Sequence, residues 1–136
     1  MASILQIENL TKSYGDRMLF ADVTFGMEEG DKIGVVARNG TGKSTLLRII
    51  CDRESADSGN VTWRLGTKVG FLEQTPDFGT ARTIKEAAMQ HAEPTVENEL
   101  ECERLLSQLQ LPDAAASPDH LSGGQRKRIA LVRTLL

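Results

Sequence analysis

A glycine-rich segment in the first third of the chain carries residue types that suit phosphate binding. It nearly matches the pattern G-x-x-x-x-G-K-[ST] and consists of Ala37, Arg38, Asn39, Gly40, Thr41, Gly42, Lys43, Ser44 and Thr45. Gly40 and Gly42 allow the backbone to curl so that successive N–H groups converge on phosphate oxygens. Lys43 would place a positive charge on the β- and γ-phosphates, and the Ser44 hydroxyl suits Mg²⁺, which prefers oxygen ligands. The pattern predicts a phosphate- and Mg²⁺-binding loop; the alternative is a glycine-rich turn that contains Gly-Lys-Ser by chance.

One position departs from the pattern, because Ala37 stands where the motif has its first glycine. If this position requires a positive φ, alanine costs about 1–2 kcal/mol there. If the residue is simply the last of a strand, alanine costs little. The sequence leaves both possibilities open.

The segments around this loop are predicted to be a strand and a helix. The apolar run 33–37 suits a strand buried on both faces, and residues 43–52 have the apolar spacing of a buried helix. Upstream, 4–7 and 19–27 are predicted strands. The loop would thus lie between a strand and a helix, the context that a phosphate loop requires.

The segment after this helix is predicted to form a ribbon of two strands. Residues 57–60 are a predicted turn, and 61–65 and 68–72 are predicted strands on either side of Gly66 and Thr67. These strands would pair with each other.

The second half of the chain is predicted to be helical. Residues 83–92 and 95–111 form two predicted helices, 112–118 a linker and 123–136 a final helix. In the second helix the residues expected to face inward are apolar: Val96, Leu100, Leu105, Leu106 and Leu109. The acidic run 93–103 indicates either a cationic partner or a solvated helix face.

A second motif, Leu-Ser-Gly-Gly-Gln at 121–125, opens the final helix. Ser122 is a favourable N-cap, and Gly123 and Gly124 expose backbone N–H groups at a helix start. These features predict a second anion site, although Ser-Gly-Gly also occurs in ordinary flexible turns.

With both motifs in this order, the chain resembles the ABC ATPase family, whose signature is Leu-Ser-Gly-Gly-Gln. The resemblance implies that Tyr14 stacks on adenine and that the loop 37–45 holds the phosphates of ATP. It also implies that Ser44 and Gln74 contact Mg²⁺. The residues that it implies take part in catalysis are Lys43, Gln74, Ser122 and Gly124. Tyr14 could instead be an ordinary core or surface tyrosine, and Gln74 a surface glutamine.

The fold implied by this resemblance is an α/β P-loop NTPase core with an antiparallel β subdomain and a helical subdomain. Residues 1–136 would form a partial cassette, divided into a nucleotide-binding part (1–74), a helical subdomain (75–120) and the signature with its helix (121–136). Two cassettes would face head to tail, with ATP between the loop of one and the signature of the other. Because the chain ends within an apolar helical pattern, we expect a fragment that stops before the family's catalytic glutamate and does not hydrolyse ATP alone.

The short spacing between Gly59 and Gln74 looks like the ABC-F subfamily, whose members carry two cassettes and act on the ribosome. The basic run 126–128 would then contact RNA or phosphate, or else form a solvated helix face. The alternatives are the ATP-binding subunit of a membrane transporter and a non-catalytic nucleotide-binding module. A second cassette downstream would favour ABC-F, and a stop after one cassette would favour a transporter subunit.

Bulk composition agrees with a cytoplasmic protein. The net charge is −3 and the pI about 5.4, so the chain as a whole lacks the positive charge typical of nucleic-acid binding. No apolar run suits a membrane helix, and no secretory signal is predicted. Cys51 and Cys102 are expected to be reduced thiols, and His91 and His120 lack metal-ligand spacing.

Overall fold

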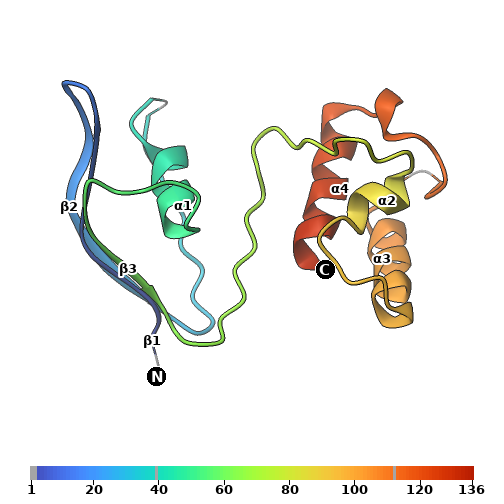
Figure 1. Cartoon of the computed structure of the whole chain (residues 1–136), viewed down its shortest axis with the longest axis horizontal. Coiled ribbons are helices and arrows are strands. Elements are labelled where there is room, and N and C mark those ends of the chain that lie inside the picture. Colours follow the sequence, from blue (N-terminus) through green and yellow to red (C-terminus); the bar gives the residue numbers. More distant parts are fainter. Residues whose placement is uncertain (1–2, 39, 112) are drawn as a thin grey trace. The chain divides into compact units, whose positions relative to one another are not determined.

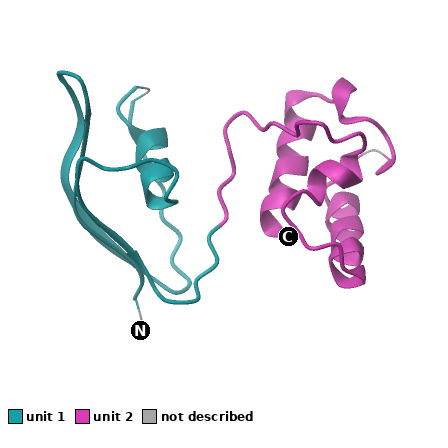
Figure 2. Ribbon diagram, in the orientation of Figure 1, with its two compact units in different colours: residues 1–69 teal, residues 70–136 magenta. Residues whose placement is uncertain are grey.

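The computed structural model describes residues 3–38, 40–111 and 113–136, which form two compact units, residues 1–69 and 70–136 (Figures 1 and 2). Asn39, predicted in the phosphate loop, and Pro112, in the predicted linker, lie outside the described residues. Because the unit boundary lies at 69/70, the tyrosine and the phosphate loop belong to the first unit. Gln74 and the signature belong to the second.

The first unit is an antiparallel sheet with one helix against it (Figure 1). The strands are β1 (Ser3–Tyr14), β2 (Arg17–Glu28) and β3 (Ser58–Trp63), in the order β2-β1-β3. The helix α1 spans Lys43–Ile50. Side chains from the central strand, Leu5, Ile7 and Leu10, are buried against Ile49 and Ile50 of α1. This packing holds α1 against the sheet, and the phosphate loop leads into the first turn of that helix.

The β1–β3 pairing depends on a close backbone approach at Gly59. Gly59 has φ +94, and a Cβ built on it would lie 2.4 Å from the carbonyl oxygen of Asn9. Only glycine has both the conformational freedom and the space for this position. The predicted turn at 57–60 is therefore wrong, because β3 already begins at Ser58 and pairs there with Thr11.

Two predicted strands are absent from the described residues. Residues 33–37 and 68–72 do not form strands, and in the first of these segments Val36 is 96% exposed. A strand requires a hydrogen-bonded neighbour, and the strands of this sheet pair only among themselves. The predicted 61–65/68–72 ribbon is replaced by pairing of β3 with β1, in which Val61 lies opposite Ile7.

The second unit is helical. It contains α2 (Ile84–Ala88), α3 (Val96–Gln108), the short 3₁₀ helix η1 (Pro118–His120) and α4 (Gly123–Leu135). Its core is built from apolar residues of all three α-helices and the preceding loop: Phe78, Ile84, Ala87, Ala88, Cys102, Leu106, Ile129, Ala130 and Val132.

The inward-facing stripe of α3 differs in part from the predicted one: Leu105, Leu106 and Leu109 lie in or against the core, as predicted. Cys102 and Leu106, one helical turn apart, are buried, whereas Val96 and Leu100 are exposed. Residues 96 and 100 share a face that points away from α2 and α4, so the prediction that they lie inside is wrong.

Candidate functional site

The phosphate loop leads directly into α1. Lys43 is the first helical residue, and Gly42 is the N-cap with φ 97, a left-handed conformation that favours glycine. Gly40 has φ +80. A Cβ on Gly42 would also lie 3.1 Å from the Cβ of Leu19. Both predicted glycines therefore fit the backbone geometry, and a glycine loop of this kind before a helix can bring N–H groups together at the helix N-terminus.

Hydrogen bonds within the first unit hold the loop. The Thr41 amide donates to the Arg38 carbonyl at 3.3 Å, and the Lys43 ammonium donates to the Ala37 carbonyl. From β2, the Arg17 guanidinium donates to the Gly40 carbonyl. Arg17 was not singled out by sequence reasoning, since no motif spacing points to it.

Ala37 adopts an ordinary backbone conformation. The described non-glycine residues with positive φ are Asn9, Asp22, Asp52 and Gln110. Ala37 is not among them, so the strain that one of the two sequence-based possibilities would have imposed is absent here. Alanine is therefore compatible with the loop conformation.

The residues predicted to contact phosphate and Mg²⁺ differ in exposure. The Ser44 side chain is exposed and lies in the first turn of α1, whereas Thr45 is buried and accepts a hydrogen bond from the Arg48 guanidinium at 3.3 Å. The Ser44 hydroxyl is thus accessible to a hydrated cation at the phosphate loop. Thr45 has a packing role in the helix.

Tyr14 ends β1 and is 48% exposed, so it is not a core residue. Its hydroxyl donates a hydrogen bond to the Glu54 carboxylate at 2.5 Å. The Lys12 ammonium lies 5.2 Å from the centre of its ring. An exposed, anchored aromatic ring in the same unit as the phosphate loop fits the predicted stacking role, which stays a prediction.

The signature motif begins α4 with a capping box. The Ser122 hydroxyl accepts from the Gln125 amide at 3.1 Å, and the Gln125 side chain accepts from the Ser122 amide at 3.0 Å. Gly123 and Gly124 follow as exposed residues in the first turn. The first N–H groups of a helix have no intrahelical acceptor, so the helix start is suited to an anion.

Replacing Ser122 with alanine should destabilise the second unit by about 0.5–2 kcal/mol, because an orphan N–H at the start of α4 loses its acceptor. Urea unfolding followed by far-UV circular dichroism measures this loss. Ser122→Asp, which retains an N-cap acceptor, is the control and should be close to the wild type. An alanine variant as stable as the wild type would contradict the capping role.

Gln74 is exposed and lies in an irregular segment whose continuation is firmly held. The Arg126 guanidinium donates to the Pro76 carbonyl at 3.3 Å, and that of Arg133 donates to the Asp77 carbonyl at 2.9 Å. The Phe78 ring lies 5.0 Å from the Arg126 guanidinium and 5.1 Å from that of Arg133. The loop after Gln74 is thus fixed to α4, within the same unit as Ser122 and Gly124.

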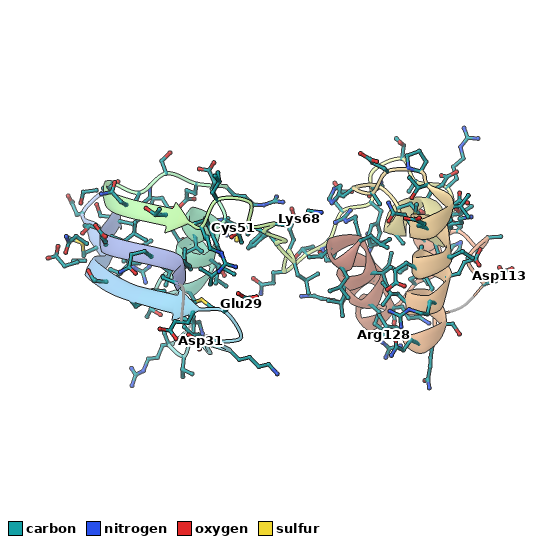
Figure 3. The ribbon with its side chains drawn as sticks, turned by 90° about the horizontal axis from the view of Figure 1, so that it is seen from below. Glu29, Asp31, Cys51, Lys68, Asp113 and Arg128 are labelled. Carbon is teal, nitrogen blue, oxygen red and sulfur yellow. The ribbon has the colours of Figure 1, made fainter. Side chains whose placement is uncertain are left out.

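The basic run at 126–128 divides into two kinds of residue. Arg126 is half-buried and engaged by backbone carbonyls, so its charge serves the fold of the second unit. Lys127 and Arg128 are exposed on α4, and Arg128 is labelled in Figure 3. Only these two residues fit the predicted solvated or RNA-contacting face.

Among the described residues, the thiols and the other side chains that could hold a metal ion form no cluster. Cys51 and Cys102 are free, and burial raises the pKa of each thiol, which keeps both protonated. Among the described residues no group of three or more His, Cys, Asp or Glu side chains could hold a metal ion, and no helix is long and apolar enough to cross a membrane.

The glycine loop with its two left-handed residues, followed by a lysine at a helix N-terminus, has the local geometry of a P-loop. The family model for ABC transporters matches residues 20–136. The chain belongs to this family. The predicted membership of the ABC ATPases is confirmed.

The relatives that match the chain include a protein named for lipoprotein release and a protein named for translation. The uncharacterized ABC transporter ATP-binding protein YfmR of Bacillus subtilis is 32% identical over 98% of the chain and 28% of its own length. The lipoprotein-releasing system ATP-binding protein LolD of Porphyromonas gingivalis is 31% identical over 98% of the chain and 70% of its own length. The energy-dependent translational throttle protein EttA of Escherichia coli is 39% identical over 61% of the chain and 15% of its own length. The chain thus spans about a quarter of YfmR and less of EttA.

Solved structures confirm the predicted fold class. An ABC transporter in an inward-facing conformation matches with a TM-score of 0.81 and 26% identity, covering 98% of this chain and 57% of that one. The α/β ABC ATPase fold, with its antiparallel sheet and its helices, is therefore established.

Proposed function

We propose that this chain binds Mg²⁺–ATP through its phosphate loop, as part of an ABC-F type ATPase that acts on the ribosome. The observation that carries ATP binding is the left-handed Gly40 and Gly42 at the start of α1, with Lys43 as its first residue. Such a loop offers converging N–H groups and a positive helix end to phosphate oxygens.

The residues present fit this ligand. The Lys43 ammonium donates a hydrogen bond to the Ala37 carbonyl at the loop. When nucleotide binds, the ammonium can donate to a phosphate oxygen instead. The exposed Ser44 hydroxyl can bind Mg²⁺, which when present neutralises phosphate charge. Gln74 is proposed as a further contact to Mg²⁺, and Tyr14 as the platform for adenine.

A second cassette is the proposed partner for the signature. The exposed Ser122 and Gly124 lie at the start of α4, where a helix favours negative charge. In the head-to-tail arrangement these groups would approach the γ-phosphate bound by the other cassette. ATP hydrolysis and a cytoplasmic location of the whole protein are part of the same proposal.

The ribosomal role is supported by the similarity to EttA, which is named as a translational throttle protein. The transporter-subunit alternative is supported by LolD, 70% of whose length the chain covers. The unstrained Ala37 removes the argument from that residue for a non-catalytic module. Sedimentation of the protein with purified ribosomes, with and without ATP, tests the first role. Recovery with ribosomes in an ATP-dependent manner supports it, and absence from the ribosomal pellet contradicts it.

Tyr14→Ala should weaken ATP binding by about 1–3 kcal/mol, the range for stacking of a base on an aromatic side chain. The melting temperature should change little, because the ring is half-exposed. Titration with a fluorescent ATP analogue and a thermal melt measure both quantities. A large loss of stability with unchanged affinity would assign Tyr14 a structural role instead.

A further inference from the structure

Tyr14 is connected to the segment that follows α1 by a chain of polar contacts. Its hydroxyl donates to the Glu54 carboxylate at 2.5 Å, and the Glu54 side chain is only 25% exposed. The other oxygen of that carboxylate lies 3.8 Å from the Arg48 guanidinium, which also donates to Thr45 at 3.3 Å. Contacts therefore run from the end of β1 to Thr45, the last residue of the phosphate motif.

A second contact restricts the ring from one side. The Lys12 ammonium lies over the ring, 5.2 Å from its centre, and the Lys12 side chain is only 13% exposed. Its position is fixed by a 2.7 Å hydrogen bond to the Ser55 carbonyl and an ion pair with Asp57 at 3.8 Å. One face of Tyr14 is thus covered by a cation that is anchored on the 55–57 segment.

We propose that Glu54 is a positioning residue for base recognition, holding the Tyr14 ring so that the face opposite Lys12 receives the base of a purine nucleotide. This inference rests on the proposed stacking role of Tyr14. Glu54 fixes the ring through its hydroxyl end, and Lys12 leaves one face for the base. A cation on the far face also draws electron density from the ring, which favours stacking of an electron-rich heterocycle.

The physical consequence is preorganisation. Without Glu54 the Tyr14 side chain samples several rotamers on the surface, and the nucleotide must immobilise it on binding. Glu54→Ala should therefore weaken ATP binding by about 3- to 10-fold, the cost of ordering one side chain. Phosphate recognition should be unchanged, because Glu54 reaches the loop only through a 3.8 Å ion pair with Arg48, and the hydrogen bond from Arg48 to Thr45 remains.

The test compares two probes, Mg²⁺–ATP and Mg²⁺–tripolyphosphate, titrated into the 136-residue chain. Glu54→Ala should weaken ATP and leave tripolyphosphate unchanged. Glu54→Gln keeps an oxygen that can accept from the Tyr14 hydroxyl and should restore most of the affinity for ATP. Tyr14→Phe removes the same hydrogen bond from the other side and should reproduce Glu54→Ala, and the double variant should be no weaker than either single one.

The matched control is Glu29→Ala. Glu29 is exposed, pairs with Arg64 at 3.3 Å in the same unit, and is labelled in Figure 3. Glu29→Ala removes the same charge as Glu54→Ala and should leave the affinities for Mg²⁺–ATP and Mg²⁺–tripolyphosphate unchanged. If Tyr14→Ala weakens ATP but Glu54→Ala and Tyr14→Phe do not, the positioning role is overturned while the stacking role stands. If Tyr14→Ala has no effect on ATP, both are overturned.

Discussion

Replacing Lys43 with alanine is expected to weaken ATP binding at least 10-fold. A charge-assisted hydrogen bond to phosphate is worth about 1.5–3 kcal/mol, and about 1.4 kcal/mol corresponds to a tenfold change in the dissociation constant. Lys43 is the first residue of α1, and its ammonium contacts the loop at the Ala37 carbonyl. The charge is therefore already at the loop and need not be brought there from solvent.

Isothermal titration of Mg²⁺–ATP into both forms measures the change. Lys68→Ala is the control, because Lys68 is an exposed lysine of the same unit, labelled in Figure 3, and its loss changes the net charge equally. Equal weakening by both variants would point to general electrostatics. An unchanged dissociation constant for Lys43→Ala would remove Lys43 from the nucleotide site.

Gly59→Ala is expected to destabilise the first unit by about 2–5 kcal/mol. The left-handed conformation costs about 1–2 kcal/mol for alanine, and forcing an atom into a packed site costs a further ~1–3 kcal/mol. At Gly59 the obstructing atoms are backbone, with Asn9 oxygen at 2.4 Å and the Leu10 Cα at 2.6 Å, so no side chain can rotate away. The β1–β3 pairing must shift instead.

Gly66→Ala separates the two contributions. Gly66 has a similar φ of +84, but no atom lies within 4 Å of a built Cβ. Only the conformational cost of about 1–2 kcal/mol should remain. Urea unfolding of the three proteins measures the difference. Equal destabilisation by the two variants would show that the close approach at Gly59 does not matter.

Local chemistry made much of the site predictable from sequence. The glycines at 40 and 42, the helix start at Lys43 and the N-cap at Ser122 each follow from residue type and spacing over a few positions. The strands β1 and β2 were predicted in part: the strand expected at 4–7 covers only the first part of β1, and the one expected at 19–27 lies within β2.

The remaining features depend on partners far away in the sequence. Whether the apolar run 33–37 forms a strand is decided by an adjacent strand, which no local pattern reveals. The contact between Tyr14 and Glu54 joins residues 40 positions apart, and that between Arg133 and Asp77 joins residues 56 apart. Polar side chains of this kind have no periodicity, so spacing rules cannot find them.

The contacts of Arg126 and Arg133 with residues 76–78 restrict the motion of that segment. Residues 76–78 lack regular secondary structure, yet the Pro76 and Asp77 carbonyls accept hydrogen bonds from α4, the Phe78 carbonyl accepts one from Gln90, and the Phe78 ring lies in the core. Local opening of this segment therefore requires the loss of its contacts with α4, so a protease should cut it more slowly than an irregular segment without such contacts.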